Sequence, residues 1–528
     1  MTISRRDFLK TALGGAVYAS TLNLKQCKPL KGPPNVLFIM TDQQPVSTLG
    51  CYGNLLYPTP NLDQLAETGI RFTDFYIGAF PCSPSRASMF TGCYPQRHGV
   101  FTNNIPLSDN NPSLGYLMRD SGWDTVYFGK SHLKGHMYRD MPWRKPFNGA
   151  WYNQRILNDE EFIIEKNKGG LGEDHPQLGF DTWAGGWKDY HAYLRQVGLG
   201  KLLEERPIPG NHNDLPSASN SKHRYSLLPE EHHMASFFTQ KAEEFLRQRH
   251  RRGRPFCMVL SYYGPHLPVA PPKPWNKKYS LEQCSLPDNH YDTLDGKPSS
   301  QRTNTYCYKF PEWKKNQYLD YIRRYYGYCA YLDCQIGRVL DALKENGLED
   351  NTIVIFTSDH GDMIGSHSYL YKMENCCYQE LCNVPFIMRV PGITSPGSVT
   401  HSLTSSVDIL PTLLGLLGVE RPQIIQGKSF SHLLHQPGAD FRDRVFIHWG
   451  PQSVVSYDGK WKFGLHANAE VDELYDRHLD PGELKNLALD KRYVEIAREK
   501  REEIIAWLHE TEHPYTPLFQ RKKTKVLS

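Results

Sequence analysis

Carboxylate, amide and basic side chains stand directly after several apolar runs of this sequence. They are Asp42-Gln43, Lys130, His266 and Asp359-His360. Carboxylate and amide oxygens are the donors that calcium and magnesium prefer, and an imidazole beside them also suits manganese. Fixed positive charge next to such a cation favours a substrate that is an anion. An isolated aspartate at such a place would more simply cap a helix, but the set as a whole predicts a metal-assisted reaction.

The most informative stretch is Pro81-Cys82-Ser83-Pro84-Ser85-Arg86, which continues to Thr91-Gly92. It resembles the signature of the type I sulfatases, Cys-x-Pro-x-Arg followed by a helix and Thr-Gly. This family belongs to the alkaline phosphatase-like superfamily, and its cysteine is oxidised to formylglycine by a maturation enzyme. The resemblance therefore implies that Cys82 becomes formylglycine. It extends from about residue 34 to about residue 490.

The same resemblance implies a set of metal ligands. Thr41-Asp42-Gln43-Gln44 is similar to the first ligand pair of the family and Ser358-Asp359-His360-Gly361-Asp362 to the second. The implied ligands are Asp42, Gln43, Asp359, His360 and the residue formed from Cys82. The family favours calcium, with magnesium or manganese as alternatives. Gln43 stands where most members have Asp, so from charge alone Gln43→Asp is expected to tighten the site.

Basic side chains then follow in the order of the family. The motifs are Gly129-Lys130-Ser131-His132, Pro265-His266-Leu267-Pro268 and Ser366-His367 with Lys372. The resemblance implies catalytic roles for Arg86, Lys130, His132, His266 and Lys372, and a substrate contact for His367. By analogy, His266 with Lys372 protonates the leaving group. His132 deprotonates the second hydroxyl of hydrated formylglycine, so that sulfate leaves and the aldehyde returns.

The implied function is hydrolysis of sulfate monoesters. Two insertions rich in Pro, Gly and aromatic residues, 136–225 and 270–312, suit loops that select a sulfated sugar or polysaccharide. A phosphonate or phosphate ester hydrolase of the same superfamily is the nearest alternative, because it uses similar residues. A non-catalytic carbohydrate-binding relative is the second, although such a protein would be expected to lose some catalytic residues. The sulfated position, exo or endo action and the oligomeric state stay open.

Alternating strand and helix patterns must position these residues. Buried strands are predicted at 35–40, 123–128, 255–261 and 352–357, and helices at 59–67, 230–249 and 316–345. The alternation predicts an α/β fold, with a large, mostly parallel sheet flanked by helices, as in the alkaline phosphatase and sulfatase fold. Because ligands bind beyond the carboxyl ends of parallel strands, the residues that follow the strands are expected to meet at one edge.

The pattern changes past Gly427. Short strands at 444–449, 453–457 and 461–465 and a helix at 493–509 predict a small C-terminal α+β subdomain with an antiparallel sheet. The predicted division is an export signal (1–27), a catalytic domain (34–427), the subdomain (428–515) and a basic tail (516–528).

The first residues predict export. Arg5-Arg6 before an uncharged stretch from Thr11 to Asn23 is typical of a twin-arginine signal, which implies the twin-arginine export machinery as a partner. The stretch is too short and too polar to span a membrane stably. Cys27 allows lipid anchoring, but Leu24-Lys25-Gln26 is a poor lipobox. A soluble periplasmic or extracellular protein is therefore favoured.

Composition excludes two classes of partner. The net charge is only +4 and the Lys and Arg residues are scattered, so nucleic-acid binding has no support. The 12 cysteines form no repeated CxxC pairs, so a structural zinc site is not expected.

Overall fold

The computed structural model describes residues 32–521 except for 104, 134–177, 185, 204–225, 250–252, 304–307, 310–312 and 374–375. The predicted export signal, with Cys27, and much of the first insertion therefore lie outside the described residues. Within the described part of the chain, no helix combines the length and the apolar character that crossing a bilayer requires.

An eight-stranded sheet forms the centre of the molecule, in the order β12-β2-β11-β9-β1-β7-β5-β6. Its central strands run parallel and are β1 (Asn35–Asp42), β5 (Asp124–Gly129), β7 (Phe256–Pro265) and β9 (Thr352–Ser358). These confirm the four predicted strands. The flanking strands, which the sequence did not predict, are β2 (Ile70–Phe72), β6 (Thr182–Ala184), β11 (Phe386–Arg389) and β12 (Ser398–Thr400). β11 runs antiparallel to both of its neighbours, so the sheet is mostly rather than wholly parallel.

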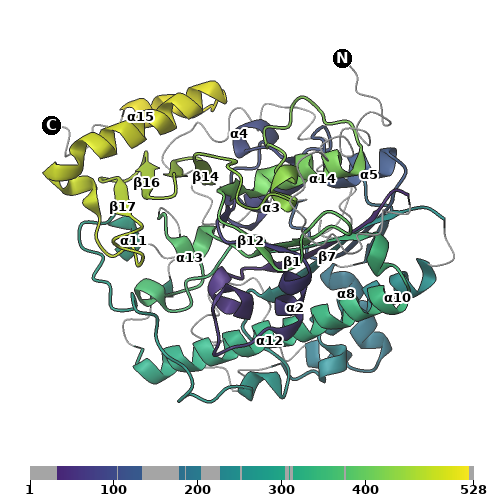
Figure 1. Ribbon diagram of the computed structural model, residues 1–528. Helices are drawn as coiled ribbons and strands as arrows, with labels where there is room; N and C mark the ends of the chain where they lie inside the picture. The colour runs from purple at the N-terminus through teal and green to yellow at the C-terminus, as the bar shows by residue number, and fades with distance from the viewer. Residues whose placement is uncertain are drawn as a thin grey trace, which may run out of the picture.

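Helices cover both faces of this sheet (Figure 1). One face carries α2 (Pro60–Thr68), α8 (Trp187–Gln196), α10 (Met234–Arg249) and α12 (Lys315–Glu345). The other carries α3 (Cys82–Thr91), α5 (Leu114–Asp120) and α14 (Ile409–Leu417). Alternate residues of β1 enter the two cores: Leu37 and Ile39 pack on the first side, Phe38 and Met40 on the second. Burial on both faces explains the continuous apolar run.

The predicted helix at 230–249 begins later than expected. Glu230–His232 form a 3₁₀ turn and the α-helix starts at Met234.

The remaining short elements are β3 (Phe75–Tyr76), β8 (Tyr308–Lys309), β10 (Tyr369–Leu370), β13 (Thr404–Ser405), α4 (Pro95–His98), α11 (Ser300–Thr303) and α13 (Gln379–Cys382).

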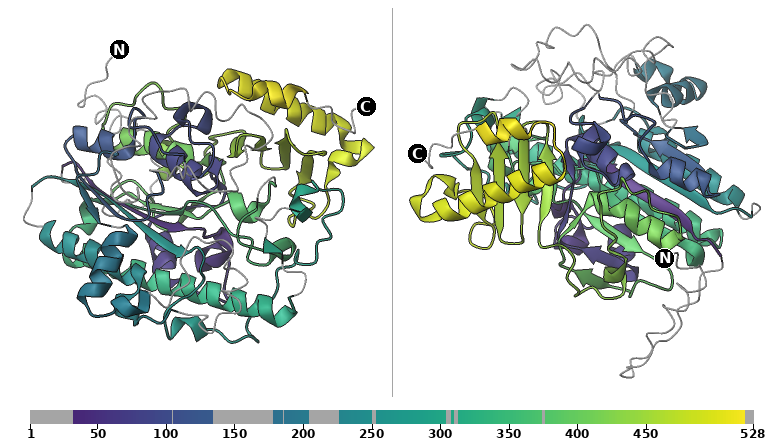
Figure 2. Two further views of the ribbon diagram at one scale, coloured as in Figure 1. Left: turned by 180° about the vertical axis from the view of Figure 1, so that it is seen from behind. Right: turned by 90° about the horizontal axis from the view of Figure 1, so that it is seen from above.

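A second, smaller sheet forms the C-terminal region (Figure 2). It consists of β14 (Val445–Trp449), β15 (Ser453–Tyr457), β16 (Trp461–His466) and β17 (Glu473–Asp476), which are antiparallel, with α15 (Val494–Glu510) packed against them. Its fifth strand is β4 (Ala79–Phe80), which pairs in parallel with β14. The Trp449 ring stacks on Phe80 at 4.2 Å, and its Nε1 donates to the carbonyl of Met373 at 3.0 Å. The subdomain is therefore joined to the segment directly before Cys82.

The predicted boundary between the subdomain and the basic tail, at residue 516, is wrong. Thr516–Arg521 form a further helix, α16. Phe519 is fully buried in the core of the subdomain with Ile504 and Leu508, and its carbonyl accepts a hydrogen bond from Arg501 at 2.7 Å. An apolar side chain within the basic sequence thus extends the subdomain to Arg521.

Two buried histidines make the stability of this region depend on pH. The rings of His448 and His513 stack with centroids 5.0 Å apart, and neither ring nitrogen of His448 has a hydrogen-bond partner among the described residues. Burial lowers the pKa of His513 to about 3 and that of His448 well below its ordinary value. Both rings stay neutral in the fold but bind a proton in the unfolded chain below pH 6.5. Their stabilisation is therefore complete above that pH and is lost on acidification.

As the pH falls from 6.5 to 5, we expect the free energy of unfolding to fall with a slope that approaches roughly 1.4 kcal/mol per pH unit for each ring. Urea denaturation across this range, with chelator present throughout, measures the slope. His448→Phe and His513→Phe should flatten it, whereas His435→Gln, at an exposed position, should not. Equal slopes in all three variants would contradict the assignment.

Candidate active site

Cys82 is the first residue of α3, and basic side chains surround its fully buried sulfur. The Sγ atom lies 3.0 Å from His360 Nε2 and 3.3 Å from Lys372 Nζ, and the thiol lies close enough to His132 and His266 to affect the pKa of both rings. Burial alone would raise the pKa of the Cys82 thiol, but the charges of the two nearest lysines, with His360, hold that pKa well below its usual value. In formylglycine the oxygen is carried by the same Cβ, so Sγ marks where a reacting oxygen would lie.

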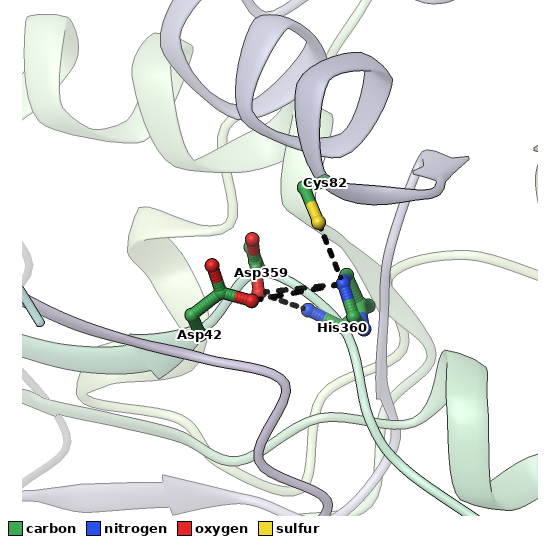
Figure 3. A group of neighbouring side chains, drawn as sticks. All are labelled: Asp42, Cys82, Asp359 and His360. Atoms are coloured by element: carbon green, nitrogen blue, oxygen red, sulfur yellow. Dashed lines mark hydrogen bonds and ion pairs between the residues drawn. The ribbon is translucent and has the colours of Figure 1, made fainter. Parts of the chain in front are cut away.

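A group of oxygen, nitrogen and sulfur donors lies next to this sulfur. Atoms of Asp42, Cys82, Asp359 and His360 all lie within 4.8 Å of one another, and Figure 3 shows the four side chains pointing toward one another. The strand register explains why Asp42 and Asp359 lie close together. β1 and β9 are parallel neighbours, and these two residues directly follow the paired residues Thr41 and Ser358.

The donor set fits a divalent cation. Asp42 Oδ1 and Gln43 Oε1 are buried and have no hydrogen-bond partner among the described residues. Buried acceptors are rarely left unpaired, since they lose hydration and gain nothing in return. A hard cation would satisfy both oxygens, and carboxylate with amide oxygen is the set that calcium or magnesium prefers.

Arg86 holds the two carboxylates in place from within the core. Its Nε donates to Asp359 Oδ2 at 2.7 Å, Nη2 lies 3.4 Å from Asp42, and Nη1 donates to the Lys130 carbonyl and Ser261 Oγ. Burial would lower the pKa of Arg86, but Asp359 and Asp42 raise it, so the side chain is charged. Since all three nitrogens bind within the protein, Arg86 acts on the site by orienting its carboxylates.

Lys130 reaches the site because a glycine ends β5. Gly129 has a φ of 103°, and a Cβ atom there would lie 1.8 Å from the carbonyl oxygen of Ser261. Only glycine permits this close approach of β5 to β7. The Lys130 ammonium forms an ion pair with Asp42. Burial would raise the pKa of Asp42, but the charges of Lys130, His266 and Arg86 together outweigh it, and the pKa falls to about 2.

His266 and Lys372 lie together beside Cys82. Lys372 Nζ is 3.4 Å from His266 Nε2, and the hydroxyl of Tyr371 is 2.9 Å from the same nitrogen. His266 Nδ1 lies 2.9 Å from the Leu267 carbonyl, which assigns a proton to Nδ1. Lys372 forms no ion pair with a carboxylate of the described residues, so its charge is available to an anion. The sequence interpretation missed Tyr371, whose place next to Lys372 was the only signal.

His367, for which a substrate contact was predicted, is enclosed by other side chains of the protein. The side chain is fully buried, its Nδ1 lies 2.6 Å from Asp292 and its Nε2 lies 3.1 Å from Asn289. The ring also stacks on Tyr378 at 3.9 Å. Because both ring nitrogens are engaged inside the protein, the geometry gives no support to a substrate contact by His367.

Comparison with known proteins identifies the family of this chain. The family model for sulfatases matches residues 34–419, and that for the C-terminal region of N-sulphoglucosamine sulphohydrolase matches residues 365–510. The uncharacterized sulfatase YidJ of Escherichia coli (strain K12) is 30% identical over 91% of this chain and 88% of its own length. The N-acetylglucosamine-6-O-sulfatase of Bacteroides thetaiotaomicron is 25% identical over 94% and 89%.

Solved structures share the fold. The phosphonate monoester hydrolase of Agrobacterium radiobacter has a TM-score of 0.70 at 24% identity, over 90% of this chain and 96% of its own. A protein solved with its substrate D-glucosamine-2-N,6-O-disulfate has a TM-score of 0.69 at 22% identity, over 91% and 98%. The predicted α/β fold, with its large sheet and C-terminal subdomain, is confirmed. With a family model that covers most of the chain, the protein belongs to the sulfatase family of sulfuric ester hydrolases.

Proposed function

We propose that this sulfatase hydrolyses sulfate monoesters of a saccharide, using formylglycine at position 82 and a divalent cation, which we take to be calcium. The observation that carries the proposal is the surroundings of Cys82 Sγ. This buried atom lies beside two carboxylates of a cation site and within 3.3 Å of the Lys372 ammonium. Such a place suits a nucleophile that attacks an anionic group, because charge that develops in the transition state meets fixed positive charge.

The metal ligands would be Asp42, Gln43, Asp359 and His360, together with residue 82. When bound there, the cation would supply Lewis-acid chemistry toward the sulfuryl oxygens and the attacking hydroxyl. Lys372 would bind the sulfate directly, since its ammonium lies beside Cys82, whereas Lys130 would add positive charge to the site and pair with Asp42.

In the first step, one hydroxyl of hydrated formylglycine attacks sulfur and would pass its proton to a carboxylate of the cation site. A new O–S bond forms, the S–O bond to the sugar breaks, and the leaving alkoxide takes a proton from Lys372 or from Nε2 of a protonated His266. In the second step, His132 removes the proton of the remaining hydroxyl. The C–O bond to sulfate then breaks, the aldehyde returns, and sulfate leaves. An ordinary Cys or Ser side chain has no second hydroxyl for this step.

A saccharide substrate is supported by the names of relatives. The N-acetylglucosamine-6-O-sulfatase and the delta 4,5-hexuronate-2-O-sulfatase of Bacteroides thetaiotaomicron are 25% and 27% identical to this chain. The ulvan-active sulfatase of Formosa agariphila is 26% identical. We also propose export by the twin-arginine route to the periplasm or the cell exterior, since sulfated polymers are met there.

Turnover of matched substrates tests the proposal. The mature protein is assayed on a panel of defined sulfated saccharides and on phosphate and phosphonate monoesters with the same leaving group. We expect the highest kcat/KM on a sulfated saccharide and loss of activity after chelation. Faster turnover of the phosphonate would favour the alternative of a phosphonate hydrolase, and absence of turnover with residue 82 oxidised would overturn the catalytic assignment.

The position of His266 predicts a dependence on the leaving group. A sugar alkoxide is far more basic than a nitrophenoxide, so its departure needs a proton donor more. We expect His266→Ala to keep more of its activity on an aryl sulfate than on a sulfated sugar, by about 10²-fold or more. Steady-state rates on both substrates measure the difference.

His132→Ala is the matched comparison. If His132 acts only after the leaving group has gone, both substrates should slow toward one common rate, with a burst of alcohol before the slow phase. Equal losses on both substrates for His266→Ala, without a burst for His132→Ala, would show that these two roles are assigned wrongly.

A further inference from the structure

We infer that Asp362 is a positioning residue, which orients the amide of Gln43 so that its oxygen is left for the metal. The inference rests on the cation site proposed above. It concerns a residue that the ligand set does not include and that contacts both halves of the active site.

The backbone of Gln43 is fixed on both sides. Its N–H donates to Asp359 Oδ1 at 3.0 Å and its carbonyl accepts a hydrogen bond from the Tyr325 hydroxyl. The residue has a φ of 69°, in the left-handed region. Such a conformation persists in a side chain other than glycine only where the surroundings determine it. The remaining freedom of Gln43 is therefore the rotation of its side chain.

Asp362 removes that freedom. Gln43 Nε2 donates to Asp362 Oδ2, while Gln43 Oε1 is buried without a partner among the described residues. An amide has a donor end and an acceptor end. A carboxylate that takes the donor end leaves the acceptor end for the cation.

The carboxylate of Asp362 is itself held in place by further hydrogen bonds. Its other oxygen, Oδ1, accepts the backbone N–H of Ile364 at 2.8 Å and that of Tyr371 at 3.2 Å. The second of these bonds holds the segment that presents Tyr371 and Lys372 to His266. One buried carboxylate therefore sets the orientation of a metal ligand and the position of the leaving-group side.

This arrangement reverses the expectation that Gln43→Asp would tighten metal binding. The substitution would place a second carboxylate against Asp362, and two adjacent carboxylates repel each other. The added negative charge helps only if position 362 becomes a donor. In the variant that also carries Asp362→Asn, the new amide nitrogen would face the new carboxylate, while the amide oxygen still accepted the two backbone N–H groups.

The test is a cycle of variants read by calcium titration calorimetry on protein freed of metal by chelation. We expect Asp362→Asn and Gln43→Asp each to weaken binding by about 10- to 100-fold, the range usual for residues that orient metal ligands. The double variant Gln43→Asp/Asp362→Asn should recover to within about threefold of the wild type. A residue with a general role in folding would not show this reciprocal rescue.

Asp333→Asn is the control. Asp333 is an equally buried aspartate that binds Asn61 and Leu62 outside the site, so its loss should leave calcium affinity unchanged. If Asp362→Asn does not fold, Gln43→Asp with Asp362 in place keeps the test, because the inference expects the added carboxylate to weaken calcium binding, whereas charge alone would tighten it. Unchanged binding in Asp362→Asn, or a double variant no better than the weaker single one, would overturn the inference alone. A wild type that binds no divalent cation would overturn the proposed site as well.

Discussion

Cys82→Ala should abolish sulfate ester turnover, with a loss of about 10⁴-fold or more in kcat. The substitution removes the thiol, without which Cβ cannot be oxidised to the aldehyde of formylglycine, and no other nucleophile among the described residues replaces it beside Lys372 and His360. The fold should persist, because alanine fills the same buried place at the start of α3 with one atom fewer. Steady-state rates on an aryl sulfate, together with thermal unfolding, measure both parts.

Cys93→Ala is the matched control, since Cys93 is also fully buried and follows the same helix. It should keep both formylglycine at position 82 and activity. Mass spectrometry of the peptide that contains residue 82 reports the modification directly. Fully active enzyme with wholly unmodified Cys82 would refute the mechanism.

Arg86→Lys should be the second most damaging change, in spite of the retained charge. Lysine cannot reproduce the fork that binds Asp359, Asp42, Ser261 and the Lys130 carbonyl at once. One of the two buried carboxylates would then lose its partner, and we expect a loss of about 3–5 kcal/mol in the free energy of unfolding. Calcium binding should weaken too, because both carboxylate ligands lose their support. Urea denaturation and calorimetry measure the two effects.

Arg442→Lys separates stability from function. Arg442 makes a similar two-bond pair with buried Asp408, at 2.5 and 2.8 Å, outside the site. This variant should also lose stability, but its calcium affinity and its rate per folded molecule should match the wild type. If Arg86→Lys behaved in the same way, Arg86 would be a stabilising residue without influence on the metal ligands.

The central sheet could be predicted because burial on both faces leaves a continuous apolar run, as in 35–40 and 352–357. β2, β6, β11 and β12 have three or four residues each. Such short strands are too short to show a period. β4 could not be predicted for a further reason: its partner β14 lies near the other end of the sequence, and no local pattern encodes that pairing.

The candidate site also contains residues that could be predicted from the sequence and residues whose roles could not. Cys82, Lys130 and Asp359 meet because they follow parallel strands or a recognisable motif, and sequence reasoning gathers such residues. Asp362 stands in a motif that was recognised, yet its role depends on which end of the Gln43 amide it binds. Likewise, His367 matched its motif, but only packing shows that Asp292 and Asn289 engage its ring. Orientation of side chains, rather than their presence, is what the sequence leaves undetermined.

The pairing of β4 with β14 also sets an order of events during synthesis. Ala79 and Phe80 can pair with their neighbouring strand only after the ribosome has made His448 and Trp449, because these residues are their partners in the sheet. Until then the segment before Cys82 lacks its neighbouring strand and the stacked ring of Trp449. In the finished fold Cys82 has no exposed surface, so the proposed oxidation of this residue would have to precede the arrival of the late strand. The C-terminal sheet would then end the interval in which the proposed nucleophile can be made.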